Sequence, residues 1–376
     1  MSFLGKLPRP FFVLAPMDDV TDTVFRQIVA GCAPPDLYFT EFVNVDGLQS
    51  PGREKLLHKL RFTKNEKPII AQLWGLNPEN FYKTAREIAN GSLAMEANTL
   101  QSSHVDEVQE SGEAHNEMYK EVHRVTTGAD DAAMRHKHSG VASFAERQAS
   151  VMRNFAGVDL NMGCPVKTVI KNGACAALMN NRGLAEEIIE ATREGASKHF
   201  PVSVKTRVGF TTVDMSWLEL LLTKKLNMLS IYGRSAKQHS DKPPDWDTIG
   251  QVRKIRDTLC PATLIVGNGD VMSRAQGLGL ADKFKLDGIM IGRGVFADPF
   301  VFAQQSPWAG YTQKQKIELY RRHVELFAKT WTKGERRIET LNKFCKVYIS
   351  GFDGAKQLRE KLMSAKSVEG LLKILN

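Results

Sequence analysis

Eight short apolar runs, rich in β-branched or aromatic residues, recur through the first three hundred residues of this 376-residue chain. They are Phe11–Met17, Leu37–Val43, Ile69–Trp74, Val158–Met162, Val202–Val208, Met228–Arg234, Thr263–Gly269 and Gly288–Gly294. Runs that are apolar almost throughout are typical of strands buried on both faces of a parallel sheet. The segments between them have helical spacing, as in Asn77–Asn90, Leu184–Lys198, Ser216–Leu226 and Thr248–Leu259. Eight strands alternating with helices predict an α/β fold, a (β/α)₈ TIM barrel.

An open, doubly wound sheet is the alternative architecture for the same alternation of strands and helices. That fold commonly carries a Gly-rich fingerprint, GxGxxG, directly after its first strand, and this chain has none there. The barrel is therefore the predicted fold of residues 1–305.

The strand spacing is regular except between the third and fourth strands, where residues 91–150 form a polar segment with 5 Lys or Arg and 10 Asp or Glu. This segment also holds five of the nine histidines, His104, His115, His123, His136 and His138. Their spacing matches no recognised pattern of metal ligands. We therefore interpret 91–150 as a solvated acidic insertion and expect no metal site.

The strand pattern stops after Asp298-Pro299, and Thr312–Lys329 and Arg336–Ser350 have helical periodicity. Residues 305–376 hold 15 Lys or Arg and 7 Asp or Glu, so most of the net charge of +9 lies in this tail. We expect residues 306–376 to form a second, all-helical domain that binds a polyanion. A lysine-rich solvated helical face is the alternative interpretation.

The composition, with 42% hydrophobic and 25% charged residues, is that of a globular protein. No run approaches the ~18 consecutive apolar residues of a membrane span. The first apolar run is short and is interrupted by Pro16, unlike a secretory signal. The five cysteines form no CxxC pair, so neither a disulfide framework nor a zinc finger is indicated. We expect a cytoplasmic monomer that does not associate with membranes.

A barrel of this kind places its reacting groups at the C-terminal ends of the strands, with phosphate sites after strands seven and eight. Those strands end in Gly267-Asn268-Gly269-Asp270 and Ile291-Gly292-Arg293-Gly294. Glycine lets backbone N–H groups approach an anion closely, and Arg293 would add a charge-assisted contact. The two segments together predict a phosphate cradle.

Two polar side chains on other strands indicate a ligand with a polar, anionic ring edge. Gln72 can both donate and accept, as recognition of an imide requires, although a satisfied interior amide is the alternative. Lys205 lies in an otherwise apolar strand, where a buried cation is costly without an anionic partner. A reduced flavin is such a partner.

Taken in order, the strand ends resemble those of the tRNA-dihydrouridine synthase family. The motifs that carry the resemblance are Ala15-Pro16-Met17, Ala71-Gln72-Leu73, Asp159-Leu160-Asn161-Met162-Gly163-Cys164-Pro165, Lys205-Thr206-Arg207, Asn268-Gly269-Asp270 and Gly292-Arg293-Gly294. Asn-Met-Gly-Cys-Pro is the most specific of them. The resemblance covers residues 9–310 apart from the insertion and is weaker in the helical tail.

The resemblance implies an FMN-bound barrel that uses NADPH to reduce the C5–C6 double bond of a uridine in tRNA. Cys164 would be the general acid that protonates C5, and Asn161 and Arg207 would contact the uracil. The flavin would be bound by residues from several strand ends: Pro16, Met17, Asp18, Gln72, Lys205, Tyr232, Asn268, Gly269, Asp270, Gly292 and Arg293.

The resemblance also implies that the helical tail binds the tRNA. The tail residues expected to contact its phosphates are Arg321, Arg322, Lys329, Lys333, Arg336, Arg337, Lys343 and Lys346.

Two residues depart from the family pattern. Tyr232 stands where histidine is usual before Gly-Arg, and Cys175 stands where glycine or another small residue is usual. Two other functions stay open at this point. One is a flavin-dependent barrel oxidoreductase acting on a small molecule, against which the basic tail argues. The other is an RNA-binding relative without activity, against which Cys164 and Lys205 argue.

Overall fold

The computed structural model describes residues 3–99 and 154–376, and it contains a single sheet of eight parallel strands. The strands pair in the order β1-β8-β7-β6-β5-β4-β3-β2. A parallel bridge between Val13 and Leu37 brings β1 back to the chain just before β2, so the sheet curls into a barrel. The strands are β1 (Phe11–Leu14), β2 (Tyr38–Asn44), β3 (Ile69–Trp74), β4 (Gly157–Met162), β5 (Val202–Arg207), β6 (Met228–Tyr232), β7 (Leu264–Asn268) and β8 (Gly288–Ile291). The predicted (β/α)₈ barrel is confirmed.

Several strands end earlier than the apolar runs that predicted them. β1 stops at Leu14 and β8 at Ile291, and the remaining residues of each run turn over the C-terminal end of the barrel. Pro16 has no N–H for a ladder, and Gly294 already begins a helix. The residues that follow the ends of these strands are therefore in the segments where we expect ligand-binding residues.

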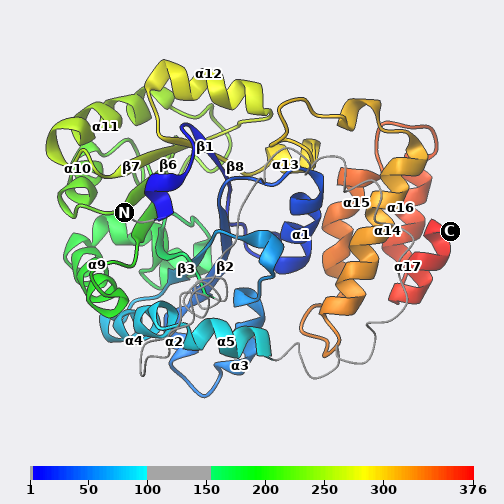
Figure 1. The fold of residues 1–376 in the computed structure, drawn as a ribbon, viewed down its shortest axis with the longest axis horizontal. Helices are drawn as coiled ribbons and strands as arrows, with labels where there is room; N and C mark the ends of the chain where they lie inside the picture. The colour runs from blue at the N-terminus through cyan, green and yellow to red at the C-terminus, as the bar shows by residue number, and fades with distance from the viewer. Residues whose placement is uncertain (1–2, 100–153) are drawn as a thin grey trace, which may run out of the picture.

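Helices cover the outside of the barrel, and most strands are followed by at least one of them (Figure 1). In α4, Asn77 caps the N-terminus by accepting the N–H of Glu79, and Pro78 occupies the first turn, as its sequence predicts. The barrel helices are α1 (Thr23–Cys32), α2 (Val45–Leu48), α3 (Glu54–Leu57), α4 (Pro78–Ala89), α5 (Ser92–Thr99), α8 (Lys167–Lys171), α9 (Arg182–Ala196), α10 (Met215–Thr223), α11 (Trp246–Leu259), α12 (Arg274–Phe284) and α13 (Gly294–Ala297).

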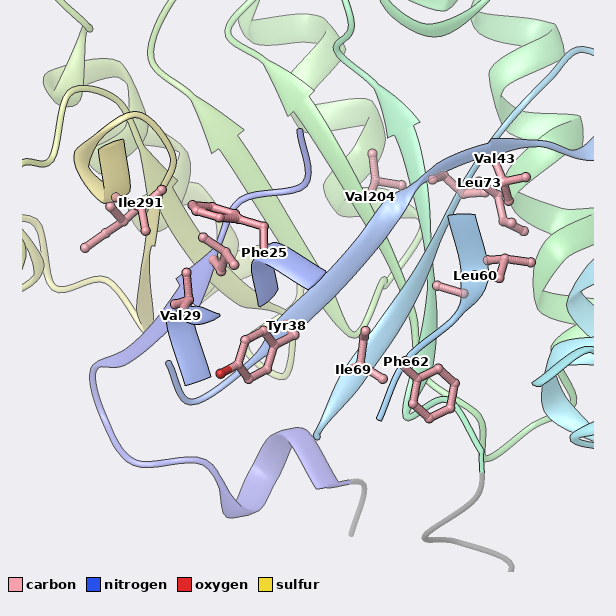
Figure 2. Close-up of a cluster of buried hydrophobic side chains, with 14 of the residues drawn as sticks. Phe25, Val29, Tyr38, Val43, Leu60, Phe62, Ile69, Leu73, Val204 and Ile291 are labelled. Atoms are coloured by element: carbon pink, nitrogen blue, oxygen red, sulfur yellow. The ribbon is translucent and has the colours of Figure 1, made fainter. Parts of the chain in front are cut away.

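Alternate residues of the strands divide between two cores. Phe11 and Val13 of β1 point into the barrel, where they pack with residues such as Met290 and with Leu4 from the N-terminal 3₁₀ turn η1 (Phe3–Lys6). Phe12 of β1 packs in the larger cluster between the barrel and its helices. Figure 2 shows part of that cluster around β2 and β3. The barrel is therefore a filled core rather than a channel.

Four helices follow the barrel: α14 (Gln313–Thr330), α15 (Asn342–Tyr348), α16 (Ala355–Ser364) and α17 (Val368–Leu375). They lie at one side of the barrel, beside α1 and α13 (Figure 1). Phe344 of α15 stacks on Phe25 of α1 with 4.8 Å between ring centroids. The apolar cluster of the barrel runs on into this tail. The tail is all-helical, as predicted, and it shares a core with the barrel.

The predicted helix Arg336–Ser350 is wrong in its first part. Residues before Ile338 are not helical, Ile338–Leu341 form a 3₁₀ turn, and the α-helix begins at Asn342. Arg336, in this non-helical part, forms ion pairs with Glu41 and Asp19 of the barrel, which a helix through this residue was not expected to allow. The helices α16 and α17 have no counterpart in the sequence analysis.

The insertion 91–150 falls mostly outside the described residues, so its histidines, including His136 and His138, are not part of this structure. Its first residues belong to α5. Among the described residues, no helix combines the length and the apolar character needed to cross a bilayer.

Candidate active site

The C-terminal ends of the strands surround a cavity of about 190 Å³. Ser240 and Val271 line it together with residues from the ends of β1, β5, β6, β7 and β8, which are Ala15, Pro16, Met17, Lys205, Arg207, Tyr232, Asn268, Asp270, Gly292 and Arg293. Most of the residues assigned to the flavin and the substrate from sequence are therefore brought together here. Asp18, Gln72, Asn161, Cys164 and Gly269 do not line the cavity.

Cys164 lies in the turn that follows β4, with its side chain half-buried. Oδ1 of Asn161 accepts the backbone N–H groups of Gly163 at 3.1 Å and of Cys164 at 3.0 Å. Gly163 passes so close to β5 that a Cβ there would lie 3.2 Å from the backbone of Thr206. This close approach favours glycine, and the two hydrogen bonds to Asn161 hold the turn that carries the thiol.

A second thiol contacts Cys164. Cys175 is fully buried at the start of the 3₁₀ turn η5 (Cys175–Asn180), where the N–H of Ala176 donates to the carbonyl oxygen of Cys164 at 3.3 Å. The hydrogen bond with Cys175 lowers the pKa of Cys164 to about 7, although burial opposes it. The same bond, together with burial, raises the pKa of Cys175 well above its ordinary value. Cys164 is therefore the thiol of the pair that ionises first.

Lys205 lies on β5 and lines the cavity. Its ammonium group makes no hydrogen bond or ion pair with any residue that the structure describes. Burial, with a smaller contribution from the neighbouring Arg207, lowers the pKa of Lys205 to about 8, although Asp159 opposes the shift. An unpaired ammonium group beside a cavity fits an anionic ligand.

Gln72 is fully buried in the barrel. Its Nε2 donates to Asp159 at 2.7 Å, and its Oε1 accepts from Asn161 at 3.4 Å. Ser203 donates to the other oxygen of Asp159 at 2.6 Å. Gln72 and Asn161 thus belong to a buried network that supports the strand ends, and the roles assigned to them in ligand binding stay predictions.

The predicted phosphate cradle contains an ion-paired cluster. Arg293, with 54% of its side chain exposed, pairs with Asp270. Asp270 also pairs with Arg234, whose side chain is 2% exposed. The hydrogen bond from Arg234, followed by that from Arg293, lowers the pKa of Asp270. Because an ionised carboxylate repels phosphate, we expect Asp270 to orient Arg293 rather than to contact the phosphate itself.

The other cradle residues have distinct positions. Nδ2 of Asn268 donates to the carbonyl oxygen of Met290 at 2.8 Å, so this side chain joins β7 to β8. A Cβ at Gly292 would meet only ordinary contacts, the nearest being 3.5 Å from Ala15. Backbone N–H groups near Gly292 therefore have room beside them for a ligand. Gly269 has a φ of +149° and lies against Pro244.

Arg207 reaches from β5 toward the Cys164 turn. Its Nε donates to the carbonyl oxygen of Gly163 at 2.7 Å, and its guanidinium lies 4.6 Å from the ring centroid of Tyr232. Burial lowers the pKa of Arg207 to about 10. Arg207, predicted to contact the uracil, is thus at the cavity and also contacts the turn that bears the thiol.

Acidic residues at the rim of the barrel are neutralised by basic ones. Asp18 pairs with Lys59 at 2.5 Å. Oxygens of Asp18, Asp19 and Glu41 lie within 4.8 Å of one another, and Arg336 pairs with the last two. The cluster is thus an ion-pair network, and Asp18 faces Lys59 rather than the cavity.

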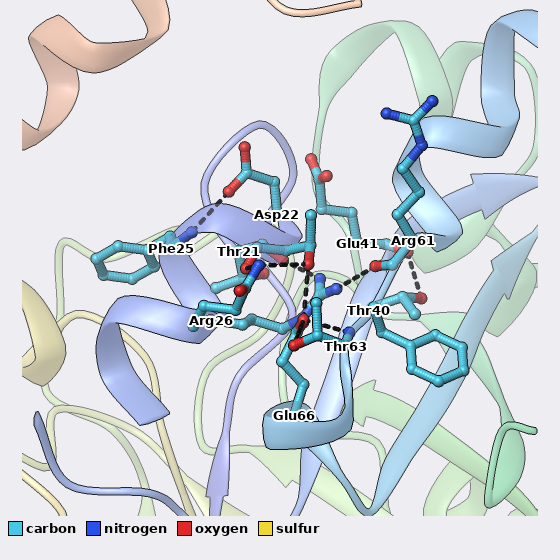
Figure 3. A network of polar contacts seen from close by, with 12 residues as sticks. Thr21, Asp22, Phe25, Arg26, Thr40, Glu41, Arg61, Thr63 and Glu66 are labelled. Atoms are coloured by element: carbon cyan, nitrogen blue, oxygen red, sulfur yellow. Dashed lines mark hydrogen bonds and ion pairs between the residues drawn. The ribbon is translucent and has the colours of Figure 1, made fainter. Parts of the chain in front are cut away.

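A second buried ion pair lies nearby, between α1 and the segment before β3 (Figure 3). Arg26 donates to Glu66 at 2.6 Å and to the carbonyl oxygens of Thr21 and Arg61, both at 2.5 Å. Arg61 in turn pairs with Glu335 of the tail at 2.7 Å. The rim of the barrel and the tail are therefore connected by a continuous set of charged contacts.

The tail residues expected to bind RNA occupy three kinds of position. Arg336 is buried in the joint with the barrel, so it is not presented to solvent as expected. Arg321 donates to the carbonyl oxygen of Leu375 at 2.6 Å within the tail. Arg322 and Lys329 are exposed and line a groove of about 520 Å³ between α1 and α14. The remaining four are exposed, and they are Lys333, Arg337, Lys343 and Lys346.

Sequence reasoning missed Arg234 and Ser240 at the site. Arg234 follows Tyr232 by two residues, so a strand-like alternation from Tyr232 would have placed both on one side. Ser240 comes from a loop after β6 with no motif of its own.

The site is that of an α/β-barrel enzyme, with a cationic cavity at the strand ends and a half-buried thiol beside it. The family model "Dihydrouridine synthase (Dus)" matches residues 13–99 and 134–376. A Staphylococcus aureus protein named "Probable tRNA-dihydrouridine synthase" is 34% identical over 370 residues, which cover 98% of this chain and 92% of that protein. Bacillus subtilis "Probable tRNA-dihydrouridine synthase 2" is 34% identical over 378 residues, covering 100% and 96%.

The chain therefore belongs to the dihydrouridine synthase family, a family of oxidoreductases. Among solved structures, morphinone reductase in complex with tetrahydroNAD aligns with a TM-score of 0.42 at 13% identity, over 81% of this chain and 90% of that one. The barrel assignment itself comes from the strand pairing.

Proposed function

We propose that this protein reduces the C5–C6 double bond of a uridine in tRNA, using FMN and NADPH, with Cys164 as the proton donor. The observation that carries the proposal is the Cys164 thiol, held in a fixed turn beside a cavity that contains the unpaired ammonium group of Lys205. Family membership supports the same reaction.

The residues around the cavity fit a flavin mononucleotide. Lys205 would meet the negative charge of a reduced isoalloxazine ring, Met17 and Pro16 offer apolar contact, and Arg293 with the backbone at Gly292 would bind the phosphate. When bound, reduced FMN supplies the hydride that C6 of the uracil receives. The cavity is smaller than the ~300–1,000 Å³ of typical cofactor sites. Binding would therefore require exposed side chains such as Arg293 to move.

Cys164 donates the proton that C5 of the uracil needs. With its pKa lowered to about 7, the thiol is still partly protonated at neutral pH, so it can act as a general acid there. Asn161 holds the turn that carries it, and Arg207 contacts the same turn from the other side. Because these groups are buried or half-buried at the strand ends, the target base must leave its stack to reach them.

The tail contributes the contacts to tRNA phosphates. Arg322, Lys329, Lys333, Arg337, Lys343 and Lys346 are exposed on the tail. Such contacts make affinity fall steeply with salt, because counterions are released on binding. We propose that the protein acts as a monomer in the cytoplasm, where tRNA is found, with residues 306–376 as the tRNA-binding domain.

The test is conversion of unmodified tRNA to dihydrouridine-containing tRNA, followed by nucleoside mass spectrometry. Cys164→Ala should keep the flavin and its reduction by NADPH, while turnover on tRNA falls by about 10²–10⁴-fold because general acid catalysis is removed. Cys32→Ala, a half-buried thiol on α1, is the matched control and should be silent. Reduction of dihydroorotate or an enone in preference to tRNA would contradict the substrate, and turnover by Cys164→Ala within tenfold of wild type would contradict the acid.

A further inference from the structure

Tyr232, at the end of β6, contacts two guanidinium groups with its ring. The guanidinium of Arg207 is 4.6 Å from its ring centroid, and that of Arg234 is 5.4 Å away. Arg234 also donates to the phenolic oxygen of Tyr232 at 2.5 Å. The aromatic ring therefore contacts two cations, and the electron density of the ring attracts both.

Each of the two arginines continues to a different part of the site. Arg207 donates to the carbonyl oxygen of Gly163 at 2.7 Å, one residue before Cys164. Arg234 pairs with Asp270, which also pairs with Arg293 of the phosphate cradle. A continuous set of contacts thus runs from the cradle, through Tyr232, to the turn that bears the catalytic thiol.

Arg234 is fixed more firmly than Arg207. It is almost fully buried, and besides Asp270 it donates to the carbonyl oxygen of Lys242. Arg207 has only carbonyl oxygens as acceptors, those of Gly163, Ser235 at 3.1 Å and His239 at 3.5 Å, and no carboxylate pairs with it among the described residues. Besides these hydrogen bonds, the guanidinium of Arg207 is attracted by the ring of Tyr232, which helps to hold it over the strand ends.

We infer that Tyr232 is a positioning residue that acts through Arg207: its ring holds the guanidinium against the Gly163 carbonyl and so fixes the orientation of Cys164. The ring has this role, and the phenolic oxygen serves Arg234. The inference rests on the proposed function for its catalytic consequence, since Cys164 must be the acid for its orientation to matter.

Kinetics of the holoenzyme on tRNA test the inference first. Tyr232→Leu should lower kcat by about 10- to 30-fold, the value of one desolvated cation–π contact, with KM for tRNA changed by less than about threefold. Tyr232→Phe keeps the ring and should retain kcat within about threefold of wild type. Equal decreases in kcat for Tyr232→Leu and Tyr232→Phe would show that the ring does not have this role.

A double-mutant cycle shows whether Tyr232 acts through Arg207. The variant Tyr232→Leu/Arg207→Ala should have the kcat of Arg207→Ala alone, because a residue that acts only through Arg207 has nothing left to position. If the decrease in kcat of the double variant equals the product of the two single decreases, the inference is overturned. Tyr232 would then act independently of Arg207, for example on the flavin.

Alkylation of Cys164 by iodoacetamide gives a readout without turnover, measured by peptide mass spectrometry across pH on the full chain as purified. Tyr232→Leu and Arg207→Ala should shift its alkylation profile by the same amount toward higher pH, while Tyr232→Phe should match wild type. An unchanged profile in Tyr232→Leu would overturn the inference. If wild type forms no dihydrouridine but the profiles behave as expected, the proposed function fails and the positioning of Cys164 by Tyr232 stands.

Discussion

Lys205 in the barrel and Arg336 in the tail are both largely buried cations, and they differ in whether a carboxylate pairs with them. Arg336 pairs with Glu41 and Asp19 and joins the tail to the barrel rim. Lys205 has no such partner among the described residues and lies beside the cavity. A paired buried cation holds two parts of a protein together, whereas an unpaired one marks a place for an external anion.

The largest effect on stability is expected from Arg336→Met. It would leave Glu41, whose side chain is fully buried, without its cation, and breaking such a pair costs about 3–5 kcal/mol. Urea denaturation would measure the decrease. The double variant Arg336→Met/Glu41→Gln is the control and should recover most of the unfolding free energy. A decrease below about 1 kcal/mol in the single variant would show that this joint does not hold the tail.

Lys205→Met should affect ligand binding strongly and stability only slightly, the reverse of what is expected for Arg336→Met. Because no carboxylate is left unpaired, the unfolding free energy should fall by no more than about 1 kcal/mol. Retention of the yellow flavin on gel filtration should drop by at least about tenfold, as expected when a charge-assisted hydrogen bond to the ligand is removed. Unchanged retention would show that Lys205 does not bind the flavin. The proposed difference in role between Lys205 and Arg336 would then be wrong.

The same contrast separates what the sequence could predict from what it could not. The eight strands were predictable because most of their residues are apolar, and the phosphate cradle at the ends of β7 and β8 stays a prediction. The ion pair of Arg336 with Glu41 joins residues 295 apart in sequence, so periodicity near Arg336 indicated a helix instead. Pairing across such distances depends on the fold, which no local pattern encodes.

The contact between Cys164 and Cys175 could not be predicted from the sequence for a similar reason. The two thiols are eleven residues apart, and Cys175, where they meet, has a left-handed backbone with φ of +52°. Non-glycine residues seldom adopt that conformation, so spacing alone gave no sign of it. Arg234 was missed although it belongs to the same strand end as Tyr232, since its partner Asp270 comes from β7.

The pH dependence of kcat should show whether Cys164 or Lys205 controls activity. The acid works in its protonated form, so kcat should fall as pH rises through about 7, the pKa of Cys164. Cys175→Ala removes the hydrogen bond that lowers this pKa, so the fall should move toward the ordinary value of about 8.5. At pH 8 this variant should then turn over faster than wild type. A fall that lies near pH 8 in both wild type and Cys175→Ala would instead be assigned to Lys205, whose pKa is about 8.

The smallest effects are expected from single cations on the tail surface, which should behave unlike either buried cation. Lys329→Ala and Lys346→Ala leave no buried charge unpaired, so the unfolding free energy should change by less than about 0.5 kcal/mol. Each variant removes one interaction with a tRNA phosphate, so the slope of log affinity for tRNA against log salt should decrease by about one. Filter binding over a salt series measures it, with Lys283→Ala on the barrel helix α12 as a matched control that should keep the slope. If tail and α12 variants change the slope alike, binding depends on overall charge, and the basic tail has no special part in holding the tRNA.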